Sequence, residues 1–266
     1  MRAGDKLKQK NNKDANFKMK QKIRTVRIKP SVRDVVAFIL FITLIFSVVY
    51  SFVRFLLAPE AIADGAEYEK LKSDYLLMLT QCALGLVVMM IPTIITHRFK
   101  LMVPGVMCIL YYVFLYCAIF LGEIFSFYYR IPIWDSILHA MSAAMLGALG
   151  FILVDWLNKD EHVKLSMNPL FVSLFAFSFA LMIGTLWEIY EFSFDSILGL
   201  NMQKARLEDG TPLIGSAAVT DTMKDLIIDA LAALAVAIIG FFTNIKRNKS
   251  PTGAECASTP DEELID

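Results

Sequence analysis

Hydrophobic residues fall into six long runs that contain few charges. The runs cover about residues 33–58, 74–96, 101–122, 134–157, 169–194 and 222–244. A helix needs about 20 apolar residues to cross the hydrocarbon core of a bilayer, and each run is long enough. The pattern therefore predicts an all-α, polytopic membrane protein with six transmembrane helices. We expect one membrane domain at 33–245, with a disordered basic arm at 1–32 and a disordered acidic tail at 246–266.

Charge is distributed unevenly along the chain, although the net charge is zero. Residues 1–33 hold 12 Lys and Arg residues, whereas the segment from Pro251 onward holds five acids and no base. Because positively charged flanking segments stay in the cytoplasm, this bias predicts that the N-terminus and the C-terminus are both cytoplasmic. We expect the arm to contact anionic lipid headgroups at the bilayer surface. Phe17 is its one aromatic residue, so nucleic acid is not an expected partner.

In the last three runs, small residues recur at steps of four positions and lead into acids. The three ridges read Asp135, His139, Ala143, Gly147; then Ala176, Ala180, Gly184, Glu188; then Asp221, Asp225, Asp229, Ala233, Ala237. Side chains four positions apart lie on one side of a helix, and small residues let transmembrane helices pack closely. Since successive helices alternate in direction, the acids should converge in one leaflet. The charge bias places that leaflet on the outer side.

The first three runs carry no such polar ridge and are interpreted as a scaffold. Pro92 should kink the second run near its inner end, and Glu123 is expected in a short outer loop. The connection at 196–220 is the longest between runs. It either folds over the acids as a lid or re-entrant segment, or is an ordinary interfacial loop.

Acids this deep in a membrane indicate a functional site, because each ionised one costs about 2.5–3.5 kcal/mol. The candidate cations Arg54, Arg130, Lys224 and His139 are too few to balance them. A bound divalent cation is the simplest answer. Oxygen ligands favour Mg²⁺, Mn²⁺ or Ca²⁺, and one histidine admits Zn²⁺ or Mn²⁺. The chain has no HExxH sequence and no nucleotide-binding loop.

The sequence suggests a role for each polar residue of the site. The predicted metal ligands are His139, Glu188, Asp225 and Asp229. Either Glu191 or Asp135 would act as general base towards a metal-bound water. Asp195 and Asp221 are supporting residues, and Asp221 lies where an acid can cap a helix.

Three segments resemble the signatures of the YjdF-like bacterial inner-membrane proteins. They are Trp134-Asp-Ser-Ile-Leu-His139, Trp187-Glu-Ile-Tyr-Glu191 and Asp221-Thr-Met-Lys-Asp225. The similarity covers roughly residues 75–242, and Asp229 is an additional acid beyond the pattern. A looser similarity links the chain to the VanZ-like membrane proteins, which also place an Asp-xxx-His pair and a late Asp in spans. The resemblance implies a multi-span protein of the bacterial cell membrane and supplies no substrate.

Three functions fit these observations. The first is a protein that binds a divalent cation and acts on, or senses, a lipid or lipid-linked envelope molecule. The second is a cation- or proton-coupled transporter, because intramembrane acids also mark such pathways. The third is a non-catalytic membrane scaffold whose polar cluster fixes the packing of its helices. Whether the protein is an enzyme stays open at this point.

Overall fold

The computed structural model describes residues 31–61, 69–158 and 167–249. Most of the predicted arm and tail therefore lie outside the described residues. Within them the chain is helical and forms no strand; its β-type pairing is one isolated bridge between Arg206 and Pro212. The elements are α2 (Val32–Leu57), α3 (Lys72–Val88), α4 (Ile91–Phe99), α5 (Gly105–Leu115), η1 (Tyr116–Ile124), α6 (Phe127–Arg130), α7 (Trp134–Leu157), α8 (Pro169–Leu198) and α9 (Ser216–Lys249).

Six helices of the described chain are long and apolar enough to cross a membrane, which confirms the predicted all-α polytopic fold. α3 with α4 counts as one span, and so does α5 with η1. The last two helices exceed their predicted lengths, because α8 continues to Leu198 and α9 begins at Ser216. α8 stops where Gly199 adopts a left-handed conformation (φ 67°), which glycine reaches without steric cost.

Two irregularities interrupt the second and third spans. The predicted kink near Pro92 is a break: α3 ends at Val88, and α4 starts with Pro92 in its first turn, where a missing N–H costs no helical hydrogen bond. The third span changes from α-helix to the wider π-helix η1 at Tyr116. π-Helical segments are rare in proteins, and those that occur are often found at functional sites.

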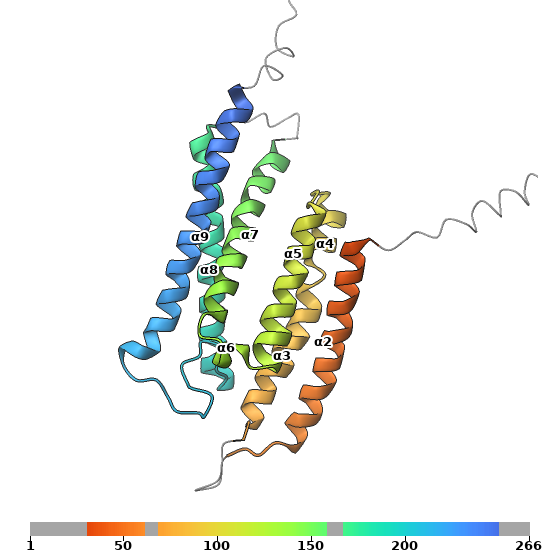
Figure 1. The fold of residues 1–266 in the computed structure, drawn as a ribbon, viewed down its shortest axis with the longest axis vertical. Coiled ribbons are helices and arrows are strands. Elements are labelled where there is room, and N and C mark those ends of the chain that lie inside the picture. Colours follow the sequence, from red (N-terminus) through yellow and green to blue (C-terminus); the bar gives the residue numbers. More distant parts are fainter. Residues whose placement is uncertain (1–30, 62–68, 159–166, 250–266) are drawn as a thin grey trace, which may run out of the picture.

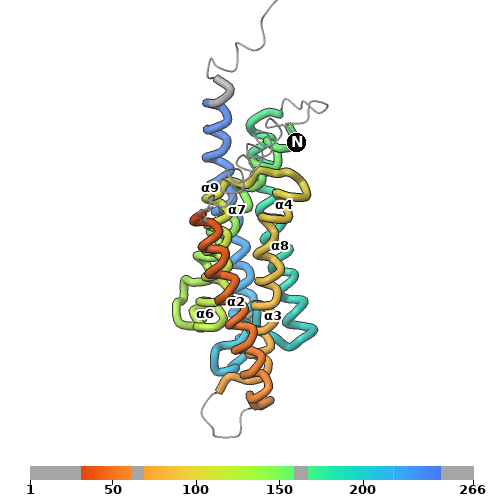
Figure 2. Tube along the Cα trace, turned by 90° about the vertical axis from the view of Figure 1, so that its right-hand side faces the viewer, coloured from red at the N-terminus to blue at the C-terminus, as the bar shows by residue number. Residues whose placement is uncertain are grey.

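The spans pack as two halves of three (Figure 1). The N-terminal half contains α2, α3–α4 and α5–η1, and the C-terminal half contains α7, α8 and α9, each of which contacts the other two. Contacts between the halves are fewer and run mainly from α5, α6 and η1 to α7. Viewed from the side of α2, the N-terminal half lies in front of the other (Figure 2).

Small residues form the seams of the C-terminal half, as the four-residue ridges predict. Gly150 faces the backbone of Ala176, and Gly147 faces Val236. At the polar end, Gly184 faces the carboxyl group of Asp229. The three helices can therefore approach closely along their apolar parts and hold their acids at one end of the bundle.

Candidate functional site

The imidazole of His139 lies at the centre of a buried acidic cluster contributed by α7, α8 and α9. Its Nδ1 atom lies 3.3 Å from Asp229 Oδ1. Its Nε2 atom lies 3.7 Å from Asp135 Oδ1 and 3.7 Å from Glu188 Oε1. The structure therefore places an acid on each side of the ring, and the two ring nitrogens face different carboxylates.

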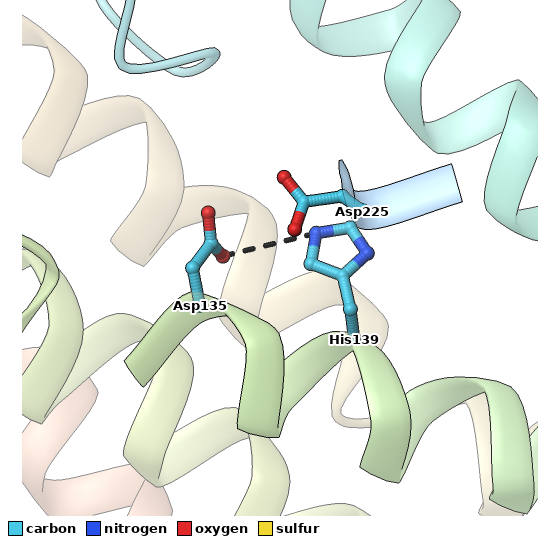
Figure 3. A group of neighbouring side chains, drawn as sticks. All are labelled: Asp135, His139 and Asp225. Atoms are coloured by element: carbon cyan, nitrogen blue, oxygen red, sulfur yellow. Dashed lines mark ion pairs between the residues drawn. The ribbon is translucent and has the colours of Figure 1, made fainter. Parts of the chain in front are cut away.

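Asp225 completes a group that could hold a metal ion. One ligand atom from each of Asp135, His139 and Asp225 lies within 4.8 Å of the others, and Figure 3 shows the three side chains turned towards a common point. Their donor set, two carboxylates and one imidazole, suits Mn²⁺ or Zn²⁺ and accepts Mg²⁺. The structure thus brings the other three predicted metal ligands, Glu188, Asp225 and Asp229, together with Asp135 around the His139 ring.

Two buried carboxylate oxygens in the cluster have no hydrogen-bond donor among the described residues. They are Glu188 Oε1 and Asp225 Oδ1, on side chains that are about 95% buried. An unsatisfied buried acceptor costs about 1–3 kcal/mol, and more when it is charged. A cation or a proton at these oxygens would remove that cost.

The other predicted site residues occupy different places. Glu191 lines the same cavity as His139 and is half-buried. Asp195 accepts hydrogen bonds from the backbone N–H groups of Met202 and Gln203, at 2.8 and 3.0 Å, so it shapes the loop after α8. Asp221 does not cap a helix as expected, because α9 begins at Ser216 and its first turn holds no acid; the side chain is half-buried.

A cavity of about 390 Å³ extends from the cluster into the space between the two halves. Its polar end is lined by Asp135, His139, Asp229, Glu191, Glu123, Tyr128 and Lys204. The rest is almost entirely apolar and includes Ile95, Val103, Met107, Leu115, Leu146 and Leu149. Ligand-binding pockets commonly have about this volume, with a few polar groups at one end of an apolar wall.

A buried ion pair joins the two halves at the polar end. Lys204 Nζ lies 2.9 Å from Glu123 Oε1, and both side chains are about 90% buried. The ammonium also lies 4.6 Å from the ring centroid of Tyr128 and 5.4 Å from that of Tyr129, which are cation–π distances. Burial opposes the charge, but Glu123 and Tyr129 favour it more strongly, so the pKa of Lys204 lies above its ordinary value.

The segment 199–215 folds back onto the bundle. Leu200 and Met202 are buried against Leu77 of α3. The Asn201 side chain donates to the Tyr129 hydroxyl at 3.0 Å and to the Arg206 carbonyl at 2.8 Å. Met202 and Lys204 of this segment also line the cavity.

One expectation about a charged residue is wrong. Glu123 lies within the π-helix η1 and not in the expected short outer loop, and its side chain is buried beside the cavity. The first three spans therefore contribute to the polar end as well as supporting it. Arg54, one of the four candidate cations, is exposed and donates to the Tyr75 hydroxyl at 2.8 and 3.0 Å.

Lys204 lines the polar end of the cavity, and the sequence did not single it out. The segment that contains it is long and mixes apolar with charged residues, a composition that is compatible with a loop that folds back onto the helices. Nothing local distinguished Lys204 from the neighbouring Arg206, whose guanidinium binds the carbonyls of Gly199 and Leu200. The pairing with Glu123 joins positions 81 residues apart and depends on the tertiary fold.

A family model described as Predicted membrane protein (DUF2238) matches residues 68–246. The chain belongs to this family. The DUF2238 match covers five of the six spans, the whole acidic cluster, Glu123 and Lys204, and it begins after α2. A search of the curated proteins found no significant match to the chain, and a search of the solved structures found none.

Proposed function

We propose that this integral membrane protein binds one divalent cation between α7 and α9 and uses it to act on, or sense, a lipid or lipid-linked molecule of the cell envelope. The observation that carries the proposal is the arrangement of Asp135, His139 and Asp225, whose ligand atoms lie within 4.8 Å of one another. The buried oxygens of Glu188 and Asp225 that have no hydrogen-bond donor among the described residues are also consistent with a bound cation.

The geometry favours different roles for the acids, some as metal ligands and one as the residue that orients His139. His139 would bind the cation through Nε2, which faces Asp135 and Glu188. Asp229 would then accept from Nδ1–H and fix the ring, the outer-shell arrangement that metal-bound histidines usually show. Asp229 is thus proposed as an orienting residue and Asp135 as a ligand, with Glu191 as the general base of an enzymatic version.

The apolar cavity supports a lipid in preference to a transported ion. An ion that leaves the cluster towards the other face would meet Leu146, Leu149 and Val103 instead of oxygen ligands. The seam along Gly147 is closed by Val236. The resemblance to YjdF-like proteins is consistent with a bacterial cell membrane, and the basic arm supports cytoplasmic termini with the cluster facing outward.

Metal analysis of the purified protein tests the proposal. After equilibration with Mg²⁺, Mn²⁺, Ca²⁺ or Zn²⁺ and removal of free ion, the wild type should retain about one cation per chain. Asp225→Asn and His139→Ala should lose it, while Glu60→Gln, whose side chain is 82% exposed, should keep it. A wild type without any retained cation, or variants that retain it fully, would refute the proposal.

A further inference from the structure

The apolar part of the cavity is long enough to hold the hydrocarbon chain of a lipid. Along α7 it extends from Asp135 to Leu149, which is about 21 Å of helix at about 1.5 Å per residue. The hydrocarbon core of a bilayer is about 30 Å thick, so the cavity passes beyond the depth of one leaflet. Its walls come from α3, α4 and α5 on one side and from α7 and α8 on the other.

The polar end of the cavity contains one basic side chain besides His139, which is Lys204. A lysine ammonium has three N–H donors, and the acceptor it reaches among the described residues is Glu123. The rings of Tyr128 and Tyr129 lie beside it and leave it weakly solvated. Lys204 is thus a buried, charged donor in the polar lining of the cavity, which Asp135 and His139 of the candidate cation site also line.

We infer that the cavity holds the hydrocarbon chain of a lipid whose headgroup is a phosphate, and that Lys204 binds this phosphate beside the cation. The inference rests on the proposed cation site. Without the cation, the acids of the cluster would repel an anionic headgroup. With it, phosphate oxygens can bridge the cation and the ammonium, since divalent cations are commonly held by carboxylates together with phosphates. With the cation bound, a cationic headgroup could not bridge the cation and the ammonium, because it carries the same charge as both.

Native mass spectrometry of the detergent-purified full chain tests this assignment. The probes are dioleoyl phosphatidic acid, dioleoylglycerol, a long-chain amine and inorganic phosphate, each with the retained cation or with EDTA. Phosphatidic acid should bind about tenfold more tightly than dioleoylglycerol, and EDTA should abolish the difference. Inorganic phosphate, which lacks a chain, should bind more weakly than phosphatidic acid.

Two variants separate the headgroup from the chain. Lys204→Met combined with Glu123→Gln removes the ion pair without leaving one charge buried, and should bind phosphatidic acid no better than dioleoylglycerol while keeping its cation. Leu146→Trp fills the cavity and should weaken both lipids, whereas Leu231→Trp, on the exposed face of α9, should weaken neither.

The outcomes are separable from those of the proposed function. A protein without any retained cation fails the proposed function itself. A protein that keeps its cation overturns only this inference if it binds dioleoylglycerol or the long-chain amine as tightly as phosphatidic acid. The same conclusion follows if inorganic phosphate binds equally well, or if the Lys204→Met, Glu123→Gln variant retains the wild-type preference.

Discussion

The Nδ1 atom of His139 on α7 lies 3.3 Å from the Asp229 carboxylate on α9, across 90 positions of sequence. The Asp229 side chain is 2% exposed, so water does not compete for this contact. In a neutral ring the contact favours a proton on Nδ1, and it leaves Nε2 turned towards Asp135 and Glu188. This one interaction orients the ring at the centre of the site.

Asp229→Asn should therefore weaken the cation without abolishing it. An amide can no longer impose the Nδ1–H tautomer, and loss of an outer-shell partner typically costs about 10–100-fold in metal affinity. Calorimetric titration of the apo-protein would measure the change. Asp225→Asn should be affected more severely, because Asp225 is a proposed ligand. Equal affinity of Asp229→Asn and the wild type would contradict the orienting role.

Gly184 should be required for the placement of Asp229. A methyl group at this position would overlap the Asp229 carboxyl group, which would have to move. Gly184→Ala should lower cation affinity while circular dichroism shows an unchanged helix content. The matched control is Gly105→Ala, since nothing lies within 4 Å of a Cβ there. Undiminished affinity in Gly184→Ala would show that the Asp229 position is not essential.

Removing one partner of the Lys204–Glu123 ion pair should destabilise the protein more than removing both. Each single change leaves the opposite charge buried, at a cost of about 3–5 kcal/mol. Lys204→Met combined with Glu123→Gln should recover most of this loss. Thermal unfolding in detergent, run as a double-mutant cycle, measures the coupling. Additive losses would indicate that the pair does not form.

The proposed orientation predicts that the loop at 199–215 faces outward. Thr211→Cys, at an exposed position of that loop, should react in intact cells with a membrane-impermeant maleimide. Arg98→Cys, at the exposed end of α4, should react only after the membrane is opened. Both changes are made in a chain whose own four cysteines, Cys82, Cys108, Cys117 and Cys256, are replaced by alanine, so that only the introduced thiol is labelled. The reverse pattern would place the cluster on the cytoplasmic side.

Much of the fold follows from the sequence because the bilayer sets the length of each span. The steps from Asp221 to Ala237 and from Ala176 to Glu188 were enough to predict that small residues pack and acids converge. Helix ends were less predictable. Gly199 ends α8 four residues later than the hydrophobic run, since polar residues at a membrane surface can continue a helix.

What the sequence could not reveal depends on contacts between distant segments. The π-helical turn that carries Glu123 has no local signature, and Lys204 is one of several charged residues in its loop. Their pairing becomes visible only when the loop folds back and buries Leu200 and Met202 against α3. The cavity could not be predicted for the same reason. It lies between the two halves, and the sequence of each half is that of ordinary membrane helices.

The most direct test of the account is electron spin echo spectroscopy of the Mn²⁺-loaded protein. If His139 is a ligand, the bound ion should show modulation from one imidazole nitrogen. The modulation should persist in Glu60→Gln and disappear in His139→Ala. Bound Mn²⁺ without nitrogen modulation would contradict the proposed centre. So would modulation that survives the loss of His139, or a protein that retains another cation at an unrelated site and binds no Mn²⁺.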